Sequence, residues 1–198
     1  FDTTGSMLRV WPEISMSIDT IFREIQNKTP SVRMGGVRYR ASDPQATVTY
    51  LIQPKALTRK LPEARDFVLD ASFGGGSGGL HLGLLHAISA LNWRANASKV
   101  VLIVGDTTPR DEGLTRALAM VKEGWEQDGI IFNTLYVQTL HGEEQKPTYR
   151  LLADAGGGRF YQYNKAEKHL VDMSQEKVDV RKAEMPQDTY LKWLTPRK

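Results

Sequence analysis

Three oxygen-bearing side chains stand at alternate positions near the start of the chain: Asp2, Thr4 and Ser6, in the stretch FDTTGSM. Two later loops offer similar groups, with Ser77 in GGGSGG and Asp106 in GDTTPRD. Carboxylates and hydroxyls without His or Cys suit a hard divalent cation such as Mg²⁺, Mn²⁺ or Ca²⁺, and do not suit structural zinc. With so few carboxylates, water or the acidic group of a partner would complete the coordination. The three loops therefore predict a metal site.

Each loop taken alone has a simpler interpretation. Asp2 and Thr4 could cap a helix that follows them, and Asp106 and Thr107 could cap a later one, because Asp and Thr oxygens accept hydrogen bonds from the first N–H groups of a helix. Three such loops at one end of the same sheet favour the metal site over capping. The choice therefore depends on the elements that position the loops.

Helical and strand patterns alternate along the chain. Apolar residues at helical spacing predict helices over 11–27, 57–71, 80–93, 111–128 and 148–155. Strand patterns occupy 32–40, 46–52, 99–106, 130–138 and a short stretch after the glycines at 156–158. The first two strands, joined by a turn at 41–45, predict an antiparallel hairpin. The later alternation predicts a mostly parallel, doubly wound sheet with helices on both faces, whose carboxyl edge gathers the three loops.

The motifs resemble those of a known family. DTTGSM (2–7) is similar to the Asp-x-Ser/Thr-x-Ser signature, often extended as Gly-Ser-Met, of the metal-ion-dependent adhesion site (MIDAS) of von Willebrand factor A (vWA) domains. Further stretches resemble later parts of that fold: VRMGGVRYR, ATVTYLI, GGGSGGLHLGLLHAI, KVVLIVGDTTP and LADAGGGRFYQ. The resemblance covers residues 1–173. It implies a Rossmann-like α/β domain with one antiparallel edge strand, and leaves 174–198 as a charged tail or linker.

The resemblance also implies roles for the candidate ligands. Thr4 and Ser6 would bind the cation through their hydroxyls, and Asp2 and Asp106 would act as carboxylates, directly or through water. Ser77 stands where many relatives have Thr or Asp, so the second loop departs from the family pattern. The implied function is a noncatalytic, Mg²⁺-dependent (or Mn²⁺- or Ca²⁺-dependent) protein-binding module. A partner protein's Asp or Glu would complete the coordination.

The first motif, DTTGSM, lies almost at the start of the given sequence. In vWA domains it follows an apolar strand at the middle of the sheet, whereas only Phe1 precedes it here. A sheet without a central strand would expose two unpaired edges and a large apolar surface. We therefore expect upstream residues or another segment to supply that strand, and the chain to be part of a larger protein.

Two alternative functions stay open. GGSGG fits the Gly-x-Ser-x-Gly pattern of serine hydrolases, and Ser77, Asp106 and His141 or His169 follow in hydrolase order. A nucleophile elbow needs a strand directly before its serine, however, and the segment before Ser77 reads as a helix. The chain could also be a structural or regulatory module of a larger enzyme or assembly. A P-loop is excluded, because Gly-Lys-Ser/Thr does not occur.

Bulk properties narrow the class of protein. The 198 residues suffice for one sizeable α/β domain, and the formal net charge is only +3, with scattered basic residues. We therefore expect no nucleic-acid partner. The chain contains no cysteine, which excludes disulfides and thiolate metal sites. We also expect no membrane span, since no run approaches the roughly 18 apolar residues that one needs.

Overall fold

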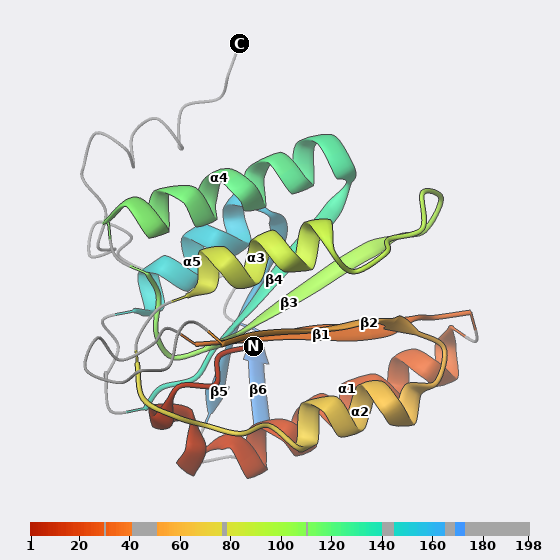
Figure 1. Cartoon of the computed structure of the whole chain (residues 1–198), viewed down its shortest axis with the longest axis horizontal. Helices are drawn as coiled ribbons and strands as arrows, with labels where there is room; N and C mark the ends of the chain where they lie inside the picture. Colours follow the sequence, from red (N-terminus) through yellow and green to blue (C-terminus); the bar gives the residue numbers. More distant parts are fainter. Residues whose placement is uncertain are drawn as a thin grey trace.

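The computed structural model describes residues 1–29, 31–40, 51–76, 79–109, 111–139, 145–164 and 169–172. Helices lie on both sides of a layer of strands (Figure 1). The helices α3, α4 and α5 cover one side, and α1 and α2 cover the other (Figure 1). No helix in the described part of the chain is long and apolar enough to cross a membrane.

The first half of the chain holds a short 3₁₀ turn, three helices and two strands. In order they are η1 (Gly5–Arg9), α1 (Trp11–Lys28), β1 (Met34–Arg40), β2 (Leu51–Thr58), α2 (Leu61–Leu69) and α3 (Leu80–Ser89). Pro12 and Pro62 each lie in the first turn of a helix, where the missing N–H has no intrahelical partner to lose. The helix α1 begins at the predicted residue, whereas α2 begins at Leu61 and not at 57, because Leu57 and Thr58 belong to β2.

The second half alternates strands and helices. Its elements are β3 (Lys99–Gly105), α4 (Asp111–Asp128), β4 (Ile130–Tyr136), α5 (Lys146–Ala155), β5 (Gly157–Asn164) and β6 (His169–Asp172). Gly129 follows α4 with a φ of 64°, a left-handed conformation that glycine adopts without steric cost. The predicted helix over 111–128 is confirmed.

The strands form two hydrogen-bonded groups. One is a four-stranded sheet in the order β3-β4-β5-β6, in which β3–β4 and β4–β5 are parallel and β5–β6 is antiparallel. The other is the antiparallel pair β1–β2. Parallel strands joined by helices, beside an antiparallel hairpin, confirm the predicted α/β fold class.

Residues 1–3 connect the two groups. The Asp2 N–H donates to the Val104 carbonyl of β3 at 2.9 Å, and the Thr3 N–H donates to the Tyr39 carbonyl of β1 at 2.9 Å. Asp2 and Tyr39 also form a parallel β-bridge. The first residues therefore lie as a short extended segment between β1 and β3, and the N-terminus lies beside these strands in Figure 1.

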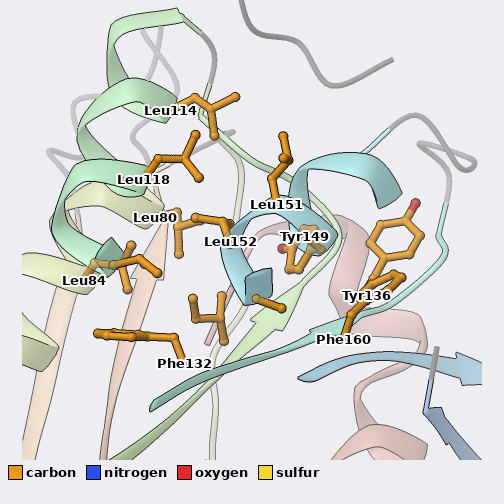
Figure 2. Close-up of a cluster of buried hydrophobic side chains, with 14 of the residues drawn as sticks. Leu80, Leu84, Leu114, Leu118, Phe132, Tyr136, Tyr149, Leu151, Leu152 and Phe160 are labelled. Carbon is orange, nitrogen blue, oxygen red and sulfur yellow. The ribbon is translucent and has the colours of Figure 1, made fainter. Parts of the chain in front are cut away.

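Two apolar clusters fill the spaces between helices and strands. The larger one joins α3, α4 and α5 to β3, β4 and β5, and Figure 2 shows its Leu118, Phe132, Tyr149 and Leu152. The second joins α1 to the opposite side of the strands, where Trp11, Ile14 and Ile18 are buried together with residues that include Val104, Leu135 and Tyr163. Both faces of the central strands are covered, which explains their continuous apolar sequences.

The strands differ from the sequence prediction in two main respects. The second strand spans Leu51–Thr58, so it begins later than predicted and includes Pro54, which is acceptable because β2 pairs only with β1 among the described strands. The sequence analysis assigns no strand to 169–172, whereas His169–Asp172 forms an antiparallel strand on β5. A second antiparallel edge strand therefore joins the predicted one. The predicted turn at 41–45 and tail at 174–198 lie outside the described residues.

Candidate metal centre

Asp2 is the most enclosed of the candidate ligands. Its side chain is fully buried, with Oδ1 accepting the Thr4 N–H at 2.8 Å and Oδ2 accepting the Thr107 hydroxyl at 2.7 Å. The backbone bond from Asp2 to Val104 holds the residue at the end of β3. Both carboxylate oxygens are thus fixed in place before any ligand binds.

Thr4 and Ser6 lie beside each other. Their hydroxyl oxygens are 3.1 Å apart, Thr4 is buried, and Ser6 is partly exposed. Neither Thr4, at the start of η1, nor Val10, at the start of α1, makes a side-chain capping hydrogen bond. The capping interpretation of Asp2 and Thr4 is therefore wrong, and the two hydroxyls point to each other instead.

Asp106 follows directly after β3 and is fully buried. Its Oδ2 accepts a hydrogen bond from the Thr139 hydroxyl, whereas its Oδ1 is buried and has no hydrogen-bond partner among the residues that the structure describes. A buried carboxylate oxygen normally has a partner, because desolvation without compensation is costly. This oxygen therefore marks a place where a ligand is expected.

A second set of contacts holds the GDTTP loop against the first loop. Tyr149, buried on α5, donates its phenol O–H to the Thr107 carbonyl at 3.0 Å, while the Thr107 hydroxyl bonds to Asp2. Figure 2 shows the Tyr149 ring within the apolar cluster, beside Tyr136. A Cβ on Gly105 would lie 2.5 Å from the Tyr149 Oη and 2.8 Å from the Asp2 Cβ. Only glycine allows this close approach.

The second loop comes close to the first through its backbone. The Gly74 N–H donates to the Thr3 carbonyl at 3.1 Å, and Thr4 and Gly74 form a parallel bridge. Gly76 and Gly79 both have positive φ values, 103° and 97°. Ser77 lies between them, outside the described residues, so its role as a ligand stays a prediction.

The Asp2 carboxyl is harder to ionise in the folded protein than in water. Burial raises the pKa of the Asp2 carboxyl from 3.8 to about 6, and the neighbouring Asp106 carboxylate acts in the same direction, while hydrogen bonds from Thr107 and Thr4 oppose the shift. In the described part of the chain no lysine, arginine or histidine forms an ion pair with either carboxylate. Among the described residues, the cluster therefore holds two carboxyl groups and no cationic side chain paired with them.

The donor set fits a hard divalent cation. It consists of carboxylate and hydroxyl oxygens, and one carboxylate oxygen has no partner. The described residues contain no group of three or more His, Cys, Asp or Glu side chains that could hold a metal. A cation here would thus depend on two carboxylates supplemented by hydroxyls and water, which favours Mg²⁺-type over zinc-type binding.

Sequence reasoning brought together Asp2, Thr4, Ser6 and Asp106, and the structure places their loops at one edge of the strands. It did not identify Thr139 or Tyr149 as supporting residues. Thr139 follows β4, as Asp106 follows β3, so its position in the chain could have suggested it. Tyr149 reads as an ordinary core residue of a helix, and no local signal marks the reach of its hydroxyl.

Comparison with known proteins addresses the fold. Among solved structures, the VWA domain of SpRpn10 matches with a TM-score of 0.57 and 15% identity, covering 78% of this chain and 78% of that one. The fold is vWA-like. An uncharacterized membrane spanning protein from Vibrio fischeri aligns over 84% of this chain and 89% of its own at 14% identity, but its TM-score of 0.30 is too low to bear on the fold. No protein-family model and no curated protein matches the chain.

Proposed function

We propose that this vWA-like domain is a divalent-cation-dependent protein-binding module. The observation that carries the proposal is the buried Asp106 Oδ1, which has no hydrogen-bond partner in the described part of the chain and belongs to the same cluster as the buried Asp2. Two carboxylates brought together without a cationic side chain oppose folding, and a bound cation would relieve that repulsion.

The proposed ligands come from three loops. Asp2 and Asp106 would supply carboxylate oxygens, and Thr4 and Ser6 would supply hydroxyls, with Ser77 as a further hydroxyl from the second loop. Mg²⁺ is the preferred cation, with Mn²⁺ and Ca²⁺ as alternatives, since all three take oxygen ligands. The cation would supply a Lewis-acidic centre for an external oxygen ligand.

The partly exposed side of this cluster suits a partner protein that presents an Asp or Glu. Asp2, Thr4 and Asp106 are buried, whereas Ser6 is partly exposed and Gly5 is exposed, so the site opens toward solvent on the side of the η1 loop. A carboxylate approaching there could complete the coordination. We propose ligation rather than turnover, within a larger protein or assembly.

Thermal unfolding tests the cation dependence. We expect saturating Mg²⁺ or Mn²⁺ to raise the Tm by about 5–10 °C, because a ligand at about 100 times its Kd contributes about 2.7 kcal/mol. Asp106→Asn and Ser6→Ala should remove most of that rise. Asp19→Asn is the matched control. Asp19 of α1 pairs with Arg65 of α2 at 2.5 Å, away from the loops, so this variant should keep the full rise in Tm. An unresponsive parent chain would refute the proposal.

Partner binding and catalysis need separate measurements. A pull-down in Mg²⁺ against chelator should recover partners only with metal, and Asp106→Asn should recover none. Labelling with an active-serine probe tests the alternative serine hydrolase, which requires Ser77 as nucleophile. Labelling of Ser77 by the probe would favour turnover over ligation.

A further inference from the structure

Two arginines lie at the rim of the candidate metal centre and have no part in its proposed ligand set. Arg9 is the last residue of η1, and Arg40 is the last residue of β1. Arg9 is exposed, and Arg40 is partly exposed. Neither guanidinium forms an ion pair with another residue in the described part of the chain. Each can therefore pair with an external anion.

The geometry of η1 places Arg9 on the same face as Ser6. The Met7 N–H donates to the Thr4 carbonyl and the Val10 N–H donates to the Met7 carbonyl, both at 3.1 Å, as a 3₁₀ helix requires. Side chains three positions apart eclipse each other in such a helix, so Arg9 lies over Ser6 and about 6 Å further along the axis. Ser6 is the partly exposed member of the candidate ligands. Arg9 therefore lies on the open side of the cluster.

Arg40 lies on another side of the first loop, against the backbone of the second loop. A Cβ on Gly74 would overlap the Arg40 guanidinium, so this cation covers Gly74 closely. Gly74 forms the β-bridge to Thr4, and its carbonyl oxygen lies 3.6 Å from the position that a Cβ on Gly5 would take. Gly5 is exposed and directly precedes Ser6. The two arginines therefore flank the exposed part of the first loop, one along η1 and the other across Gly74.

The charges of the rim and of the cluster select for acidic ligands once a cation is bound. The buried carboxyl groups of Asp2 and Asp106 alone repel an approaching acid. A divalent cation balances these two carboxylates, and Arg9 and Arg40 then give the surface an excess of positive charge. Complementary charge favours an acidic partner and excludes a basic one. One external carboxylate would complete the coordination of the cation, and further carboxylates would reach the arginines.

We propose that the cation and the two arginines together recognise an extended segment of a partner protein with acidic residues at alternate positions. The proposal rests on the proposed function: the central carboxylate binds the cation, and the acidic residues on either side of it pair with Arg9 and Arg40. Residues two apart in an extended segment lie on the same side, about 7 Å from each other. This spacing matches the step of about 6 Å from Ser6 to Arg9 along η1.

Fluorescence anisotropy with two labelled peptides tests the proposal. One peptide is Gly-Glu-Ser-Asp-Ser-Glu-Gly, and its matched control, Gly-Gln-Ser-Asp-Ser-Gln-Gly, keeps only the central acid. In saturating Mg²⁺ we expect the three-acid peptide to bind about tenfold more tightly than the one-acid peptide. Raising NaCl to about 0.5 M should reduce this preference, because salt screens charges at the surface. Equal affinities, or no binding of either peptide, would overturn the proposal.

Arginine variants assign the preference to this rim. Arg9→Gln and Arg40→Gln should each weaken binding of the three-acid peptide about threefold, as expected for an exposed ion pair, and leave binding of the one-acid peptide unchanged. Arg33→Gln is the matched control, because Arg33 is an exposed arginine just before β1, at the opposite end of that strand from Arg40. An equal loss in all three variants would show that only net charge matters, and would contradict the assignment.

Thermal unfolding separates this proposal from the function on which it rests. The three arginine variants keep every proposed ligand, so each should retain the rise in Tm with Mg²⁺. A rise in Tm without a peptide preference would overturn the recognition of an acidic segment alone. A parent chain without any rise would overturn the cation site, and this proposal with it. Undiminished peptide binding in chelator would also overturn it, as would tighter binding of an oligothymidylate, which would assign the arginines to nucleic acid.

Discussion

The Thr107 hydroxyl donates to the Asp2 Oδ2 at 2.7 Å, across 105 positions of sequence. This bond joins the loop that opens the chain to the loop that follows β3. It is buried, and it bonds directly to the carboxylate whose pKa is raised to about 6. This hydroxyl is therefore one of the contacts that align the two loops.

Replacing Thr107 by Val should destabilise the protein by about 1.5–3 kcal/mol at neutral pH, the usual contribution of a hydrogen bond to a charged group. The cost should shrink near pH 4, where Asp2 is protonated in the folded protein. Urea unfolding at both pH values measures it. Thr134→Val is the control. The Thr134 hydroxyl donates to the Tyr149 backbone carbonyl at 2.9 Å, and that acceptor does not ionise, so the cost of this variant should not depend on pH. A pH-independent cost for both variants would contradict the assignment.

Tyr149→Phe should leave the Thr107 carbonyl without its phenol donor and weaken the response to Mg²⁺. The stability loss should be about 1–2 kcal/mol, because the freed carbonyl is buried. Tyr163→Phe is the matched control, because it also removes one phenol hydrogen bond. The Tyr163 hydroxyl donates to Glu13 of α1, on the opposite face of the strands, at 2.7 Å. Thermal scans with and without Mg²⁺ distinguish them: only Tyr149→Phe should reduce the metal-induced shift, and an equal reduction in both would argue against a supporting role.

Gly105→Ala should damage the candidate metal centre by steric contact alone. The new Cβ would lie 2.8 Å from the Asp2 Cβ, so Asp2 must move, at a cost of about 1–3 kcal/mol. Gly124→Ala in α4 is the control, because its Cβ would lie 2.9 Å from the Phe132 ring, within the core. Both variants should unfold at lower temperature, but only Gly105→Ala should lose the cation response. Full response in Gly105→Ala would disprove the close approach.

The fold was predictable where local pattern and tertiary packing agree. In α4 the apolar positions Leu114, Leu118 and Val121 are all buried, and Gly129 ends the helix. The loops with Asp2 and Asp106 meet because the carboxyl ends of parallel strands share one edge of a sheet. Residue type and strand order together were enough to anticipate this part of the site.

Other features depend on contacts that sequence does not display. The strand Leu51–Thr58 contains Pro54 and Lys55, which are weak strand formers, and it forms because β1 offers a hydrogen-bonding edge. His169–Asp172 becomes a strand by pairing with β5. The Tyr149 phenol reaches Thr107 only after α5 packs on the strands. In each case the local structure depends on the distant segment of the chain that it pairs with or packs against.

The order of pairing along the chain has a kinetic consequence. The strand β3 pairs with β4, and β4 pairs with β5, each through a single crossover, whereas Asp2 must reach residues more than a hundred positions away. Closing that long loop is entropically costly, so we expect the βαβαβ half to assemble first and the acidic cluster to assemble late. Interactions that form after the transition state act on the unfolding rate. Stabilisation at the acidic cluster should therefore lengthen the lifetime of the folded protein while leaving its refolding rate nearly unchanged.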